Sequence, residues 1–243
     1  MIEQQFQREF NVGAIRPIEC YKEAWAMIKD QYWMVFAIVL VGLLIGSALW
    51  LVLLGPMMCG IYICLLDKEA GLPATFDRLF RGFNFFLPGF LLCLLIMIPM
   101  IIMAVLVYLP MIGLAIAGQS MSEGELIAFL AVVVVVELIF ALIMVLIHSL
   151  VIFSFPLVVD RGLSAFEAVK LSARAVWHNL SGIAGLFGVG MVVVLVGYMM
   201  LCVGVYLVIP LIMAATVTAY RKVFPRIGSA FTQPPPPSYY QGL

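Results

Sequence analysis

The chain has 243 residues, of which 65% are apolar and 11% charged, and its mean hydropathy is +1.17. Soluble domains have about 45–50% apolar and about 25% charged residues, so this composition excludes an ordinary soluble protein and a disordered chain. Thirteen basic residues balance 13 acidic ones, which leaves no excess positive charge to attract nucleic acid. The composition therefore predicts an integral membrane protein.

The N-terminal segment 1–14 is polar and lacks the basic start and apolar stretch of a signal peptide. We therefore expect it to remain on the protein, ahead of one transmembrane domain over 15–224. Five cysteines follow along the chain without a CxxC pair, and four of them lie in apolar runs. We interpret them as small buried side chains and expect neither a disulfide framework nor a metal site.

Four long apolar runs between short basic zones define the predicted spans. They cover residues 31–66, 82–122, 126–159 and 175–220. A spanning helix needs about 20 residues, so the first and last runs have room for two spans each, with turns near Gly46 and Cys202. Each central run is expected to cross once, which makes a central hairpin over 84–159 around the acidic connector 119–125.

The positive-inside rule turns these runs into a topology. All four basic zones, and with them both termini, are placed in the cytoplasm, while the acidic connector lies outside. The prediction is an all-α, polytopic transmembrane helix bundle of six spans. Pro99 and Pro110 leave an eight-span alternative open, because they either kink one long helix or separate two crossings.

An amphipathic segment precedes each outer hairpin, and the two segments match at a spacing of 148 residues. Their apolar positions are Ile18, Tyr21, Trp25, Ile28 and Tyr32, matched by Phe166, Val169, Ala173, Val176 and Leu180. Steps of three and four residues place each set on one helical stripe. We interpret 16–68 and 164–222 as a parallel internal repeat, each half with a helix in the cytoplasmic interface and its stripe toward the acyl chains. Chance similarity of two lead-in segments is the alternative.

Local signals support the starts of these helices. Pro17 suits the first helical position, and Ser164 with Glu167 has the spacing of a capping box. A third short interfacial helix is expected in the loop 67–88. Its apolar side chains are Phe76, Leu79, Phe80 and Phe83. Glycines spaced through the run after 181 are expected to let neighbouring helices approach closely.

No standard catalytic or metal-binding motif occurs, so we expect neither an enzyme nor a cofactor. Glu137 is the one ionisable side chain deep inside an apolar run, and His148, about three turns on, shares its helix face. A charged side chain at the bilayer centre costs roughly 2.5–3.5 kcal/mol, so Glu137 is expected to face the interior of the bundle. Two interpretations stay open: a proton or cation path, and a neutral acid that bonds to a neighbouring helix.

Basic side chains near the cytoplasmic interface are the second candidate site. They are Lys22, Lys29, Arg161, Lys170, Arg174 and His178. The last three step by four residues along one helix face, which suits anionic lipid headgroups at about 1 kcal/mol per basic side chain. A plain topological anchor explains the same residues equally well.

The C-terminal segment 225–243 is rich in proline and is expected to be an extended, disordered tail. Its Pro236–Tyr239 stretch matches the PPxY ligand of WW domains, so a partner that binds the tail is the alternative.

Residues 155–180 resemble a signature of the YciC-like family of bacterial integral membrane proteins, which is related to the membrane domain of some glycerophosphodiester phosphodiesterases. The matching positions are Pro156, Asp160, Arg161, Leu163, Ser164, Glu167, Ala168, Ser172, Trp177 and Asn179. The tract 76–83 is similar to the loop after the first hairpin in that group. The resemblance implies a six-helix protein of the inner membrane and implies no activity. The polar insertion 119–125 departs from the family pattern.

These features lead us to expect a non-enzymatic integral membrane protein that interacts with lipids, or serves as a scaffold or accessory subunit of a membrane assembly. The partners expected are membrane lipids, another protein or a second copy of the chain, and no nucleic acid. A small transporter or channel, with a path near Glu137 at the repeat interface, is the alternative.

Overall fold

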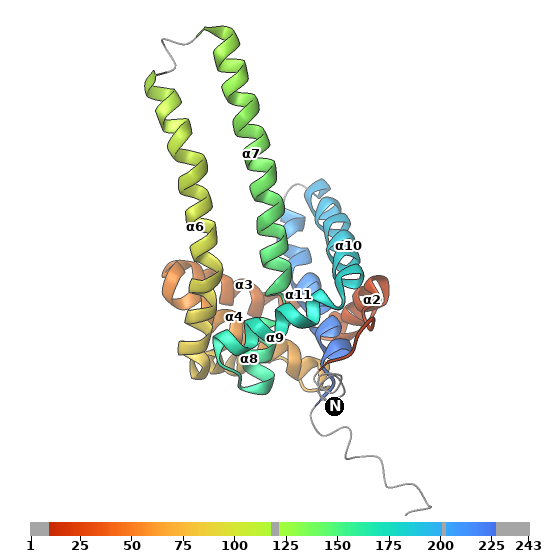
Figure 1. Ribbon diagram of the computed structural model, residues 1–243. Coiled ribbons are helices and arrows are strands. Elements are labelled where there is room, and N and C mark those ends of the chain that lie inside the picture. Colours follow the sequence, from red (N-terminus) through yellow and green to blue (C-terminus); the bar gives the residue numbers. More distant parts are fainter. Residues whose placement is uncertain (1–9, 118–121, 201–202, 227–243) are drawn as a thin grey trace, which may run out of the picture.

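The computed structural model describes residues 10–117, 122–200 and 203–226, which form helices and no strand (Figure 1). The helices are α2 Pro17–Ile28, α3 Tyr32–Ala48, α4 Trp50–Glu69, α5 Phe76–Phe80, α6 Phe86–Ala117, α7 Glu123–Leu150, α8 Ser154–Arg161, α9 Ala165–Trp177, α10 Leu180–Met199 and α11 Val203–Val223. Two 3-10 turns, η1 Lys29–Gln31 and η2 Arg81–Phe85, lead into α3 and α6. The predicted all-helical class is confirmed.

Five helical segments are long and apolar enough to cross a membrane. They are Pro17–Ala48, Phe76–Leu114, Glu123–Arg161, Leu180–Met199 and Gly204–Val223. The helix α4 is not among them, and its last turn carries the charged side chains Asp67, Lys68 and Glu69. The prediction of a membrane protein that crosses several times is thus supported, with five segments where the sequence predicted six.

The run 82–122 does not divide into two crossings within the described residues. Both Pro99 and Pro110 lie inside α6, which is one continuous helix of 32 residues. At about 1.5 Å per residue this helix is about 48 Å long, compared with about 30 Å for the 20 residues of α10. The basis for the eight-span alternative therefore disappears.

The molecule has two parts of different character. We call α6 and α7 together the long hairpin, and α2, α4, α5, α8 and α9 with the C-terminal half of α11 the base. Figure 1 shows the long hairpin rising from the base well beyond the tip of α10. The largest fully buried side chains include Phe153, Tyr220 and Phe224, which pack as a ring cluster with centroids 5.2–6.1 Å apart. The core therefore lies in the base.

Glycines let other elements touch the backbone of α4. A Cβ on Gly60 would lie 2.0 Å from the carbonyl oxygen of Leu79 in α5, and one on Gly55 would lie 2.2 Å from that of Gly89 in α6. No side chain fits in either place. The helix α4 is therefore held between the start of the long hairpin and the loop before it.

The N-terminal segment ties the two ends of the last hairpin together. Asn11 donates its backbone N–H to the carbonyl of Val223 (2.8 Å) and its side-chain amide to that of Lys222 (3.0 Å), at the end of α11. The side chain of Asn179, just before α10, accepts from the N–H of Gly13 (2.7 Å) and donates to the carbonyl of Asn11 (3.1 Å).

Cys20, Ala24 and Ile28 form the buried face of α2, which packs against α11. The hydroxyl of Thr218 in α11 donates to the carbonyl of Cys20 (3.0 Å). Two of the three side chains are small, so the helices approach closely. This face binds protein rather than lipid.

The predicted stripe of α2 is divided by this packing, which corrects the expectation that all of it faces the acyl chains. Tyr21 and Ile28 are buried, whereas Ile18 and Trp25 are 62% and 49% exposed. At about 100° per residue, Ile18 and Trp25 lie on the edge of the stripe farther from the buried face. Only that edge is left to meet lipid.

Candidate functional site

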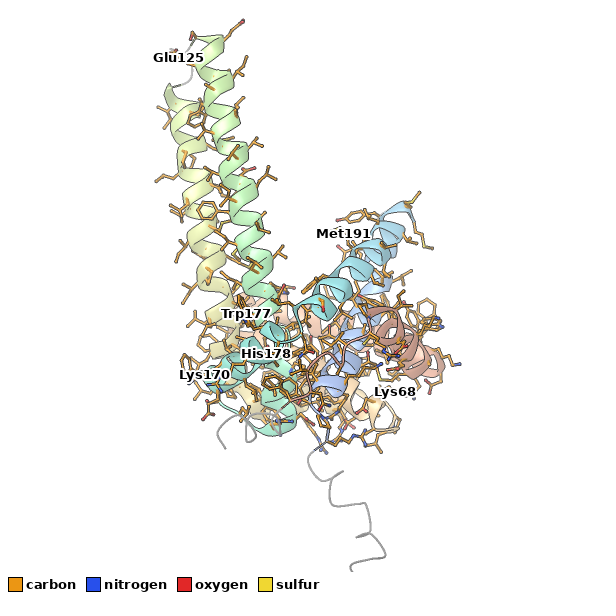
Figure 2. All side chains as sticks on the ribbon, turned by 45° about the vertical axis from the view of Figure 1, so that its right-hand side comes forward. Lys68, Glu125, Lys170, Trp177, His178 and Met191 are labelled. Atoms are coloured by element: carbon orange, nitrogen blue, oxygen red, sulfur yellow. The ribbon has the colours of Figure 1, made fainter. Side chains whose placement is uncertain are left out.

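A lateral groove of about 570 Å³ lies between the long hairpin and the hairpin of α10 and α11. Its lining includes Met100 of α6, Met144 and His148 of α7, and Phe187, Met191 and Val194 of α10. Figure 2 shows Met191 on α10, across the gap from the long hairpin, and Trp177 near the foot of this gap. The volume and the apolar lining are those of a small-molecule site.

Tyr21 of α2 closes the inner side of the lateral groove. Its hydroxyl lies 3.5 Å from the carbonyl oxygen of Leu186, to which it donates, and a Cβ on Gly190 would lie 2.7 Å from the same hydroxyl. Three of the four glycines for which close packing was predicted therefore serve it: Cβ atoms on Gly182 and Gly185 would lie 2.6 Å from Ile15 and Pro17. The prediction is wrong for Gly188, where a Cβ would meet nothing within 4 Å.

Three polar side chains reach the lateral groove, and two of them bond within the protein. Tyr21 donates to α10, and Thr216 donates to the carbonyl of Ile212 one turn earlier (3.1 Å). His148 makes no hydrogen bond within the described residues, and it lies in the last turn of α7. The groove thus offers an apolar surface with one imidazole at the end nearest the base.

Glu137 does not face the interior of the bundle, which corrects the sequence prediction. Its side chain is exposed and lines a second hollow of about 470 Å³, here called the hairpin groove, whose other lining residues come only from α6 and α7. Tyr108 of α6 lines the same hollow. No described residue of another helix lines this hollow.

Glu137 and His148 therefore line two different grooves, although both belong to α7. Met100 and Met144 contribute to both grooves, and Met144 lies between the two polar residues along α7. The segment between them offers only apolar side chains, among them Ala141. None of the described residues of the repeat halves 16–68 and 164–222 lines the hairpin groove. The prediction that a path near Glu137 runs at the repeat interface is therefore wrong about its location.

The predicted basic residues divide between exposed positions on or beside α2 and α9 and one position in the core of the base. Lys22 and Lys29 are exposed beside α2, and Lys170 is exposed on α9. Arg161 is half-buried with its guanidinium 5.0 Å from the ring centroid of Phe224, so it belongs to the core of the base.

On α9 the predicted basic face is present. Lys170, the half-buried Arg174 and His178 follow at four-residue steps. The Nδ1 of His178 lies 2.8 Å from the carbonyl oxygen of Arg174, and its ring lies 5.6 Å from that of Phe10. Neighbouring Trp177 is 67% exposed.

Several residues of the motif from which a family resemblance was predicted hold the base together. The carboxylate of Asp160 accepts from both Nη atoms of Arg221 (2.7 and 2.8 Å) and from the hydroxyl of Tyr220 (2.7 Å). Arg221 also donates its Nε–H to Glu69 (3.0 Å). The sequence analysis did not predict these partners. All four polar side chains lie at or near the ends of predicted helices: Asp160, Tyr220, Arg221 and Glu69.

Ser172 joins α9 to the bend between α7 and α8. Its hydroxyl donates to the carbonyl of Leu150 (2.7 Å) and accepts from the N–H of Phe153 (3.2 Å). Pro156 is buried in α8, and Asn179 binds the N-terminal segment as described above. Trp177 is the large apolar side chain of the motif that stays exposed, at 67%.

The capping box predicted at the start of α9 is confirmed. The N–H of Glu167 donates to the hydroxyl of Ser164 (3.4 Å), while the N–H and hydroxyl of Ser164 donate to the Glu167 carboxylate (3.1 and 2.7 Å). These bonds from Ser164 lower the pKa of Glu167 below its ordinary value. An equivalent box joins Ser122 and Glu125 at the tip of the long hairpin.

Cys20, Cys59, Cys64 and Cys93 are buried thiols, as predicted. Among the described residues, no group of three His, Cys, Asp or Glu side chains is placed to hold a metal ion. Cys202 and the PPxY stretch of the tail lie outside the described residues.

No family model, curated protein or solved structure matches this chain. The two grooves, the charged network of the base and the basic face of α9 are therefore the features from which its function is inferred.

Proposed function

We propose that this chain is a non-enzymatic membrane protein that binds one phospholipid, with an acyl chain in the lateral groove. The observation that carries the proposal is the groove itself, an apolar hollow of about 570 Å³ between two membrane-length hairpins. A groove between the sides of two spanning hairpins meets the acyl chains of the bilayer. Its methionines adapt their shape to a flexible chain.

The headgroup site of this proposal is α9, near the foot of the groove. Lys170, Arg174 and His178 form a basic face suited to an anionic phosphate. The exposed Trp177 suits the level of the headgroups, where amphipathic rings are enriched. The lipid therefore belongs to the leaflet next to the base.

For topology we infer six spans, with α4 as the sixth, and both termini in the cytoplasm of a bacterial cell, as the YciC-like resemblance implies for the inner membrane. In support, the described residues from 82 to 160 contain no lysine or arginine, while the tip of the long hairpin carries Glu123 and Glu125. This distribution follows the positive-inside rule, with the base as the cytoplasmic part.

We also infer that the outer hairpins derive from a parallel repeat. At the 148-residue spacing, α3 and α10 begin at equivalent positions, Tyr32 and Leu180. The residues before them, Gln31 and Asn179, share a backbone conformation (φ −124°, ψ 29° and φ −125°, ψ 24°), and the side-chain oxygen of each accepts a backbone N–H from a distant segment. Ile28 and its equivalent Val176 are both fully buried.

The test is native mass spectrometry of the protein extracted in mild detergent, with wild type compared with Val194→Trp. The new ring fills the lateral groove without touching α9. We expect one anionic phospholipid to remain on wild type and the variant to bind it about tenfold more weakly, the effect of 1.4 kcal/mol.

Val192→Trp is the matched control, because Val192 lies on the same helix, is 60% exposed and does not line the groove. It should retain the lipid like wild type. A wild-type protein without any enriched lipid, or equal lipid loss in both tryptophan variants, would refute the proposed function.

A further inference from the structure

The long hairpin carries a pair of polar side chains that the described residues do not satisfy. Glu137 of α7 and Tyr108 of α6 line the hairpin groove together, and both are exposed. Within the described ranges neither makes a hydrogen bond or ion pair. The surrounding lining is apolar, with four methionines and Ala104.

A carboxyl group at this depth requires a polar partner, since an intramembrane acid normally faces protein or water rather than acyl chains. The groove contains one phenol and no basic side chain. Acyl chains offer no hydrogen-bond donor, and among the described helices only α6 and α7 line the groove. The partner must therefore come from outside the described residues and carry a donor at the depth of Glu137.

We propose that a second copy of this chain supplies the partner, in a symmetric dimer formed through the hairpin grooves. In each copy the Tyr108 hydroxyl donates to the Glu137 carboxyl of the other. Two copies inserted in the same direction are related by an axis along the membrane normal, so equivalent residues meet at equal depth. In such an isologous interface one acid and one phenol per copy satisfy each other twice.

The surface around the pair suits close packing of helices. Ala104 lines the groove, and the exposed Ala141 follows Glu137 by one turn on the same face of α7. Small side chains let membrane helices approach, while methionines fill the remaining irregular space. The contact shares only Met100 and Met144 with the lateral groove, so it does not depend on a bound lipid.

Energy transfer between labelled copies in phosphatidylcholine–phosphatidylglycerol vesicles tests the proposal over a range of protein-to-lipid ratios. We expect wild type to associate, and Glu137→Leu to weaken association about tenfold or more, because two interhelical hydrogen bonds are lost. Tyr108→Phe should weaken it in the same way. Glu137→Gln keeps a polar partner of similar size and should stay within about threefold of wild type.

The leucine variant also reports on folding. Removal of an unsatisfied carboxyl from an exposed apolar surface should leave the melting temperature of the monomer in detergent unchanged or higher. Wild type that stays monomeric at every density, or that associates equally well as Glu137→Leu, would overturn the dimer.

Cysteine crosslinking locates the contact independently. Ala141→Cys should crosslink two copies, whereas Ile139→Cys should not, because Ile139 is exposed about 200° around α7 from Glu137. The four described native cysteines are buried, and wild type gives the background. Equal crosslinking at the two positions would exclude the proposed face.

Discussion

The base and the long hairpin stabilise the same chain by different means. In the most apolar 18-residue stretch of the α7 segment no residue is buried, whereas in the corresponding stretch of α11 56% are buried. The base has a ring cluster, glycine contacts to backbone and a charged network of Asp160, Arg221 and Glu69. The hairpin has two helices, two grooves and one unsatisfied acid.

The stability of the two parts therefore depends on different surroundings. The base is closed by its own side chains, so it should respond to the loss of a single contact. The exposed surface of the hairpin is covered by lipid or by another copy of the chain. Its stability within one chain should therefore change little when a single side chain is altered. A change in the base should therefore cost more stability than a matched change in the hairpin.

Gly60→Ala should have the largest effect, because its Cβ would lie 2.0 Å from the backbone oxygen of Leu79. We expect a loss of about 3 kcal/mol in the free energy of unfolding, at the upper end for overpacking. Gly113→Ala in α6 meets nothing within 4 Å and should change stability by less than about 1 kcal/mol. Thermal unfolding in detergent measures both, and equal losses would contradict the comparison.

Asp160→Ala should follow in size. It removes the acceptor of both the Arg221 guanidinium and the Tyr220 hydroxyl, in a pair whose side chains are only 14% and 20% exposed. We expect a loss of about 2 kcal/mol, less than the roughly 3–5 kcal/mol for a fully broken buried pair, because the largely buried Arg221 keeps its bond to Glu69. Glu123→Ala at the exposed tip of the hairpin should cost less than about 0.5 kcal/mol. A small effect of Asp160→Ala would show that the charged network does not stabilise the base.

Ser172→Ala tests the junction of the two parts. The variant leaves the carbonyl of Leu150 and the N–H of Phe153 without their side-chain partner, so we expect a loss of about 1–2 kcal/mol. Ser149→Ala, in α7, loses only a bond to the carbonyl of Val145 in its own helix and should be nearly neutral. Hydrogen exchange of the bend between α7 and α8 separates the two outcomes.

The capping boxes should give the smallest effect, and the same one in both parts, because both are exposed. The pKa of Glu167 is lowered in the folded protein, so its box contributes above the ordinary glutamate pKa of about 4.3 and is lost as pH falls through the lower folded value. The protection of the amides at the start of α9, taken as the intrinsic exchange rate relative to the observed rate at the same pH, should therefore fall as the pH falls below the ordinary glutamate pKa. Glu167→Gln should abolish this pH dependence, and Lys170→Ala on the same helix should keep it.

Much of the fold follows from composition and spacing. Apolar run lengths predict the hairpins, whose first turn, at Leu49, is close to the expected Gly46. The capping box of Ser164 and Glu167 is local, so four residues suffice to predict it. The interior of α6 shows why prolines are weaker signals: neighbouring turns continue the helix on both sides of Pro99 and Pro110.

The site was harder to predict because it depends on relative heights and distant partners. The rule that an intramembrane acid faces inward assumes that neighbouring helices pack around it, and hydropathy does not reveal that only α6 and α7, among the described helices, line the hollow at Glu137. Likewise, Asp160 and Arg221 are 61 residues apart, and the sequence around each residue does not indicate that the other is its partner. The stripe of α2 could be read from the sequence, but the position of α11 decides which edge is buried.

The attachment of the N-terminal segment also sets an order of events during biosynthesis. Asn11 binds Lys222, which is 211 residues later in the chain. A ribosome that adds about 5–20 residues per second makes that partner only about 10–40 s afterwards. Until then α2 has no α11 to cover Cys20 and Ala24. This face must meanwhile contact lipid or a chaperone. The first of the described helices to be synthesised is thus among the last to reach its final packing.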